Sequence, residues 1–185
     1  VIAPLATLFP LNNATNVATN VVPTISFNEA IRLADNSVID NNNVDAVVEL
    51  RLNNATGAIV PFDATISGNV ISITPLSSLT VNQTYYIALL PNTVEDLNDN
   101  GITTTQFGIF TTANPSISFA SNFITVNENQ GTLSLVLNIA NPATSLVDLV
   151  VKSAPFSTAD NADFTLASQT IFITESSPAT LTINI

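Results

Sequence analysis

Four residue types that carry much of protein chemistry are missing from this sequence. Its 185 residues include no Cys, His, Trp or Met. Without Cys, the chain forms no disulfide and offers no thiolate as a nucleophile or metal ligand. Without His, it lacks the usual general base near neutral pH and the commonest zinc ligand. Catalysis would therefore depend on carboxylates, hydroxyl groups or a few basic residues.

Basic residues are also scarce, which limits the classes of partner. The chain has 14 acidic residues and only three basic ones, Arg32, Arg51 and Lys152, which gives a net charge of -11. A chain this acidic repels a phosphate backbone and an anionic membrane surface, so we expect no nucleic-acid partner. No apolar run approaches the ~20 residues of a membrane span. The five glycines form no dinucleotide-binding or phosphate-binding pattern. We therefore expect no catalytic residues and no enzyme activity.

What the chain has in abundance is β-branched residues in short alternating runs, separated by Asn, Ser, Gly and Pro. This pattern is typical of strands and tight turns. Residues 29–43 are polar and predict a long loop, and residues 40–47, the best short helix candidate, favour a loop and the start of a strand. Strands are expected at Val22–Asn28, Ala46–Leu52, Ile59–Ile66, Val70–Thr74, Thr84–Leu90 and Gln106–Thr112. Such spacing predicts an all-β protein built on a β-sandwich.

Several spaced motifs of the first half carry a family resemblance. They are Phe9-Pro10, Ile25-Ser-Phe-Asn-Glu29, Thr84-Tyr-Tyr86, Val94-Glu-Asp96 with Asn100-Gly101, and Phe107-Gly-Ile-Phe-Thr-Thr112. Residues 3–112 resemble the bacterial Ig-like domains of the S-layer protein type. The resemblance implies a first domain over residues 1–113 that acts as a non-catalytic spacer.

The second half follows the short linker Ala113-Asn114-Pro115, and Pro115 favours an extended connection. Val126-Asn-Glu-Asn-Gln-Gly-Thr132, Ala162-Asp-Phe164 and Ile171-Phe-Ile173 resemble the Calx-β domain, another Ig-like sandwich. The resemblance implies a second Ig-like domain over residues 114–185 that lacks its C-terminal strands. An incomplete sandwich exposes strand edges, so a neighbouring subunit is expected to complete it by strand addition, unless further residues of the chain do so.

The first candidate site is the acidic stretch Val94–Gly101. Glu95, Asp96 and Asp99, with neighbouring Asn side chains, supply the oxygen ligands that calcium prefers. The stretch echoes the first half of an EF-hand loop, but Phe107 stands where that loop has its glutamate. The two alternatives are a calcium site that includes Asp96 and Asp99, and a turn between strands.

The second candidate site follows from the Calx-β resemblance. Glu128 and Asp163 match the positions of calcium ligands in that family, and Asp160 is a further candidate ligand. Two carboxylates alone bind calcium weakly, because affinity follows the number and charge of the ligands. The alternative is that these carboxylates cap turns. Calcium is the only cofactor that the sequence suggests.

These observations predict a structural segment of a secreted or cell-surface bacterial protein, such as an adhesin, a surface layer or a filament. The expected partners are other domains of the same protein or neighbouring subunits. The alternative is a glycan-binding or protein-binding module attached to a secreted enzyme. Tyr85 and Tyr86 offer little to a glycan, because alternation along a strand turns one of them into the core.

Overall fold

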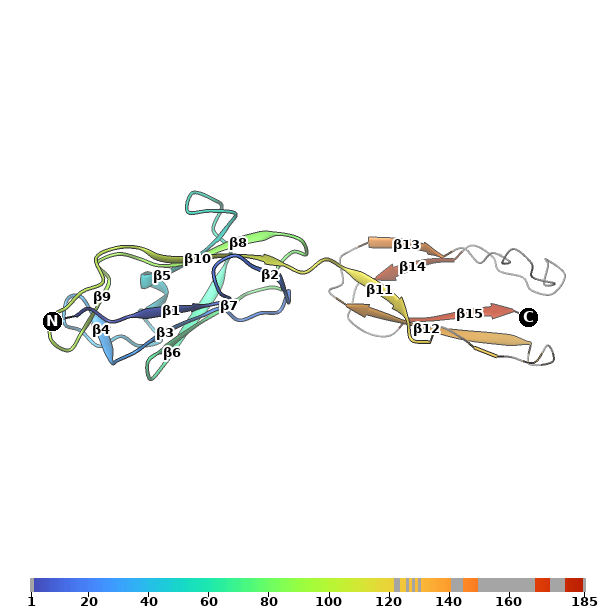
Figure 1. Ribbon diagram of the computed structural model, residues 1–185, viewed down its shortest axis with the longest axis horizontal. Helices are drawn as coiled ribbons and strands as arrows, with labels where there is room; N and C mark the ends of the chain where they lie inside the picture. Colours follow the sequence, from blue (N-terminus) through green and yellow to red (C-terminus); the bar gives the residue numbers. More distant parts are fainter. Residues whose placement is uncertain are drawn as a thin grey trace. The chain divides into compact units, whose positions relative to one another are not determined.

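The chain divides into two compact units, Val1–Asn114 and Pro115–Ile185. The division lies one residue after the expected boundary. The computed structural model describes residues 2–121, 124–125, 127, 129, 131–140, 145–149, 169–173 and 179–184, and the last three segments are described by their backbone alone. The described residues form strands and one short 3-10 helix, which confirms the all-β class (Figure 1).

Unit 1 is a sandwich of two four-stranded sheets. Sheet A has the order β1-β3-β7-β6, formed by Ala6–Phe9 (β1), Thr24–Phe27 (β3), Val70–Pro75 (β7) and Phe62–Ser67 (β6). Sheet B has the order β2-β10-β8-β5, formed by Ala14–Val17 (β2), Gln106–Thr112 (β10), Thr84–Leu89 (β8) and Val48–Leu52 (β5). Neighbouring strands are antiparallel except β2 and β10, which are parallel. The chain passes from sheet A to sheet B through the cis peptide bond Phe9–Pro10.

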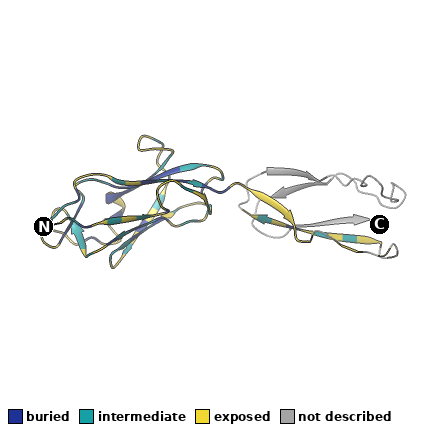
Figure 2. Cartoon of the chain, in the orientation of Figure 1, coloured by how far each residue is buried: buried dark blue, intermediate teal, exposed yellow. Residues whose placement is uncertain are grey.

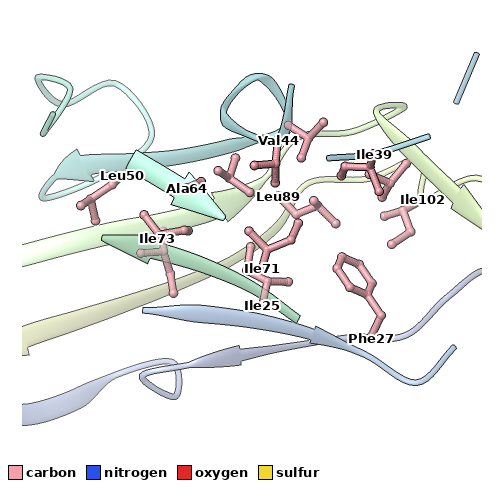
Figure 3. Close-up of a cluster of buried hydrophobic side chains, with 14 of the residues drawn as sticks. Ile25, Phe27, Ile39, Val44, Leu50, Ala64, Ile71, Ile73, Leu89 and Ile102 are labelled. Atoms are coloured by element: carbon pink, nitrogen blue, oxygen red, sulfur yellow. The ribbon is translucent and has the colours of Figure 1, made fainter. Parts of the chain in front are cut away.

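The core lies between the inner faces of these two sheets (Figure 3). Ile25, Ile71 and Ile73 from sheet A are fully buried, as are Leu50 and Leu89 from sheet B. Their alternation along each strand is the period-2 pattern that places one side of a strand inside. Ile25, Phe27, Val48, Leu50, Tyr85, Ile87 and Leu89 stand at alternating positions of strands expected from the sequence, and all are buried, whereas Leu52 is half-buried.

Some of the shorter elements differ from the expectation. The segment expected to be a long loop contains the strand Ile31–Leu33 (β4), which pairs with Val94–Asp96 (β9). Strands β1 and β2 lie outside the strands expected from the sequence, and Val44–Val47 forms a 3-10 helix (η1). The apolar residues Val22, at the start of an expected strand, and Leu76 would be expected to pack inward, but both are exposed. Strands β1, β2, β4 and β9 have three or four residues each, which is too few for an alternating pattern to be recognised in the sequence.

Unit 2 is described in part. Ser116–Phe119 (β11), Thr132–Ala140 (β12) and Ala179–Asn184 (β15) form a three-stranded antiparallel sheet in the order β11-β12-β15. Ser145–Leu149 (β13) pairs with Gln169–Ile173 (β14). Along β12, the odd-numbered apolar residues are less exposed than their neighbours, whereas β11 is exposed throughout (Figure 2).

Candidate functional site

The acidic stretch begins as a strand and continues as a tight turn. Pairing of β9 with β4 places Glu95 opposite Arg32 and Asp96 opposite Ile31. Gly101 then bridges back to Glu95, so the turn closes on its own strand. Glu95 and Asp96 are buried, although carboxylates are among the residues least often found inside proteins. Their burial requires partners on the protein, and the structure supplies them.

Asp96 acts as the cap of this turn. One carboxylate oxygen accepts hydrogen bonds from the backbone N–H groups of Asn98 at 2.8 Å and Asn100 at 2.9 Å. The other accepts a bond from the Asn100 side-chain amide at 2.6 Å. These donors lower the pKa of Asp96 below its usual 3.8, and the side chain of Asn100 contributes most. An Asp that bonds backbone two residues ahead is a well-known turn-forming device.

Arg32 holds the other two carboxylates of the stretch. Its Nε donates to Glu95 Oε1 at 2.9 Å, and its Nη2 donates to Asp99 Oδ1. Asp99 takes a positive φ of 63°, a conformation that Asp and Asn tolerate better than most residues. The guanidinium therefore lies between the two carboxylates and compensates the negative charge of the turn.

Within the described residues, no group of three or more carboxylates is arranged to hold a metal ion. The expected ligands Asp96 and Asp99 are brought to the same turn, but the first caps backbone N–H groups and the second binds Arg32. Calcium binding at this turn stays a prediction. The other expected ligands, Glu128, Asp160 and Asp163, lie outside the described residues.

The two neighbouring tyrosines face opposite sides of sheet B. Tyr85 points into the core, stacks on Phe110 with ring centroids 5.6 Å apart, and accepts a hydrogen bond from the Thr80 N–H at 2.8 Å. A tyrosine near the start of a strand that bonds backbone a few residues earlier is a feature of Ig-like sandwiches. Tyr86 lies on the outer face and stacks on Phe107 at 5.4 Å. Tyr86 is itself buried, so Phe107 supplies the exposed aromatic surface there.

Two shallow hollows lie on the surface of unit 1. One has a volume of about 270 Å³ and lies beside β5, where Ile59, Phe62 and Leu90 surround the ion pair of Glu49 with Arg51. The other, of about 280 Å³, lies between residues 19–22 and 74–78. Small-molecule sites usually enclose ~300–1,000 Å³ and bury most of the ligand. These open hollows are below that range.

Thr112 is a buried polar residue that sequence reasoning missed. Its hydroxyl donates to the carbonyl oxygen of Thr80 at 2.6 Å and accepts a bond from the Gln83 N–H at 3.0 Å. Its own N–H donates to the carbonyl oxygen of Gln83 at 3.0 Å. The sequence contained one indication of this role. Thr112 occupies an inward-facing position of an alternating strand, where an apolar residue is expected. Arg32 was missed too, although it is one of only three basic residues.

One of three comparisons with known proteins identifies the family of the first half. A family model described as a bacterial Ig-like domain matches residues 3–121, which confirms the resemblance expected for the first half. No curated protein matches the chain. Among solved structures, the N-terminal part of the bacterial S-layer protein SbsC is similar with 11% identity and a TM-score of 0.41. The match covers 99% of this chain and 44% of that one, so the chain spans less than half the length of that structure. The Calx-β resemblance stays a prediction.

Proposed function

Because the chain belongs to the bacterial Ig-like domain family, we propose that it is a non-catalytic spacer within a larger secreted or cell-surface bacterial protein. Its task is to separate and present the parts of that protein that lie on either side of it. Adhesins, surface layers and filaments are the classes of protein that use such a segment. Its partners are the neighbouring domains or subunits of the same assembly. The described residues contain no helix long and apolar enough to cross a membrane.

The observation that carries this proposal is the path of the chain through unit 1. The N-terminal segment enters beside β4 and β9, and β10 leaves at the opposite end of the unit (Figure 1). Strand β10 alone has seven residues, which span about 23 Å at ~3.3 Å per residue. A unit whose chain enters at one end and leaves at the other adds its length to the protein that contains it.

The blocked edges of the sheets support the same function. At the outer edge of β6, the N–H of Ala64 donates to Asp45 at 2.7 Å, and the N–H of Ile66 donates to Asn41 at 2.8 Å. At the outer edge of β5, residues 58–60 bond Leu50 and Leu52 through the backbone. Sheet edges with free N–H groups template the addition of another strand. Unit 1 thus covers the outer edges of β6 and β5, two of the four edges of its sheets, with its own residues, and this favours a segment that does not add strands at those edges.

The charge of the chain also fits an extracellular spacer. With 14 acidic and three basic residues, copies of the chain repel one another at low ionic strength. Such repulsion keeps neighbouring segments soluble when many copies are displayed at high density. The absence of Cys means that the fold does not depend on the redox state of its compartment.

A glycan array distinguishes the spacer from a binding module. We expect no saturable binding by the purified 185-residue chain. The alternative would be supported by saturable binding that is lost in the Phe107→Ala variant, because Phe107 is the exposed ring on the outer face of sheet B. Val38→Ala is the matched control, since Val38 is also exposed and apolar but lines neither hollow and lies outside sheet B. Binding of that kind would overturn the spacer proposal.

A further inference from the structure

Strand β10, the last strand of unit 1, is held on its β2 side by a parallel ladder. The N–H of Asn13 donates to the carbonyl oxygen of Ile109 at 2.6 Å, and the N–H of Ala113 donates to the carbonyl oxygen of Val17 at 2.7 Å. The side chain of Asn12 adds a third bond, because its oxygen accepts from the N–H of Ile109 at 3.0 Å. The segment that enters the unit is thus bonded directly to the strand that leaves it.

The exit end of β10 has a second set of bonds. Thr112 is 2% exposed and is joined to Thr80 and Gln83 by its hydroxyl and its backbone N–H. One residue later, the carbonyl oxygen of Ala113 accepts from the N–H of Asn82 at 3.1 Å. We call these bonds of Thr112 and Ala113 the exit anchor. The exit anchor ties the end of the strand to the connection between β7 and β8.

We propose that unit 1 carries tension along its length, and that the β2–β10 ladder together with the exit anchor is the element that resists it. This inference rests on the proposed spacer function, since a segment placed between two parts of a surface protein transmits any force applied between them. It adds to that function a load path and the residues that bear the load.

The direction of the strands explains why this element resists tension. Strands β2 and β10 run in the same direction, the N-terminal entry leads through β1 into β2, and β10 leads to the exit (Figure 1). Pulling the two ends apart therefore drags β2 and β10 in opposite directions along their axes. The ladder is loaded in shear, so its bonds and the exit anchor are strained together. A ladder pulled open from one end would instead lose its bonds one at a time.

The side-chain bonds of the ladder and the anchor give the test its variants. Thr112→Val keeps the branched shape of the side chain but removes the hydroxyl that serves both Thr80 and Gln83. Asn12→Ala removes the acceptor for the N–H of Ile109 from an exposed position, so it is the variant less disruptive to the core. Asp45→Ala is the matched control. It removes one bond to the edge strand β6, which lies outside the load path.

The experiment is unfolding of single 185-residue chains at constant force. Because the chain has no Cys, handles attach only to cysteines introduced by Ile2→Cys and Pro115→Cys. We expect Thr112→Val to raise the unfolding rate under load about tenfold, equivalent to ~1.4 kcal/mol of barrier. Asn12→Ala should raise it several-fold, and Asp45→Ala should leave it within twofold of the unchanged chain. Urea unfolding of each variant gives the loss of equilibrium stability for comparison.

Two results would overturn the load path. One is that the rates under load simply follow the equilibrium stabilities, with Asp45→Ala as damaging as Thr112→Val for the same loss. The other is that Asn12→Ala and Thr112→Val both leave the rate under load unchanged. Either result leaves the spacer function intact, because that function is tested separately by the glycan array. Saturable glycan binding, in contrast, would overturn the spacer function whatever the unfolding rates are.

Discussion

Replacing Tyr85 with Phe will destabilise unit 1, because the Tyr85 hydroxyl forms a hydrogen bond with the connection between β7 and β8. The Tyr85 hydroxyl accepts a hydrogen bond from the Thr80 N–H at 2.8 Å, and the side chain is 2% exposed. Phe keeps the ring and its stacking on Phe110. The variant therefore removes one hydrogen bond and leaves one partly buried N–H without an acceptor, while the packing of the core is retained.

The expected cost follows from these two effects. A protein hydrogen bond contributes ~0.5–1.5 kcal/mol net, and an unpaired buried donor costs ~1–3 kcal/mol. Because Thr80 is exposed and its bond to Tyr85 is partly buried, water compensates part of the second cost, and we expect a loss of ~1–2 kcal/mol in the free energy of unfolding. With an m-value of about 2 kcal/mol/M, the urea midpoint falls by about 0.5–1 M.

Tyrosine fluorescence is a selective assay, because the only two tyrosines of the chain lie in unit 1 and there is no Trp. Tyr86→Phe is the matched control. It makes the same change one residue later, on the outer face of sheet B, where the ring stacks on Phe107. We expect the control to cost less than Tyr85→Phe, because the buried ring and its stacking on Phe107 are kept and the bond between Tyr85 and the Thr80 N–H stays intact. The reasoning is refuted if Tyr85→Phe costs no more than the control, or if hydrogen exchange of the Thr80 amide is not faster in Tyr85→Phe.

Three further predictions concern the core and the acidic turn. Ile71→Ala removes a fully buried side chain from sheet A and should cost ~2–5 kcal/mol in urea unfolding, whereas Ile59→Ala, at an exposed position, should cost below ~1 kcal/mol. The folded pKa of Asp96 lies below 3.8, so its ionised form stabilises the fold above that pH and this contribution is lost as the pH falls through the folded pKa. Asp96→Asn should therefore reduce the dependence of unfolding on pH below about 4, and an unchanged dependence would contradict the role of Asp96 as a charged cap. Millimolar calcium should leave the melting midpoint of unit 1 unchanged, because Arg32 already binds Glu95 and Asp99; a rise that disappears in Asp96→Asn would instead support the metal site.

The long strands of unit 1 were predictable because their own residues alternate. Thr84–Leu90 and Gln106–Thr112 were expected as strands, and the structure places β8 and β10 at Thr84–Leu89 and Gln106–Thr112. Strands β4 and β9 were not predictable in this way, since each has three residues. Their identity comes from pairing with each other across more than 60 residues, and a local pattern contains no information about such a partner.

Apolar character alone also failed to predict burial at single positions. Leu76 and Leu79 stand three residues apart in the same polar connection, yet Leu79 is 5% exposed and Leu76 is 70% exposed. The N–H of Leu79 is bonded to the carbonyl oxygen of Thr19, which holds it against the sandwich. Much of the surface of a folded protein consists of apolar atoms, so an exposed Leu is ordinary. The sequence around Leu76 therefore does not indicate that this side chain is exposed.

The acidic turn shows that candidate metal ligands cannot be judged from sequence alone, because the sequence does not show which protein groups already bond their carboxylates. Glu95, Asp96 and Asp99 have the composition of a calcium site, and composition was all that the sequence offered. In the fold, the oxygens of Asp96 accept three N–H groups of the turn itself, and one oxygen each of Glu95 and Asp99 accepts a bond from Arg32. Arg32 is 63 residues from Glu95 and reaches it only because β4 pairs with β9. These contacts account for the burial of Glu95 and Asp96 without a metal, and whether the turn also binds calcium is decided by the melting experiment.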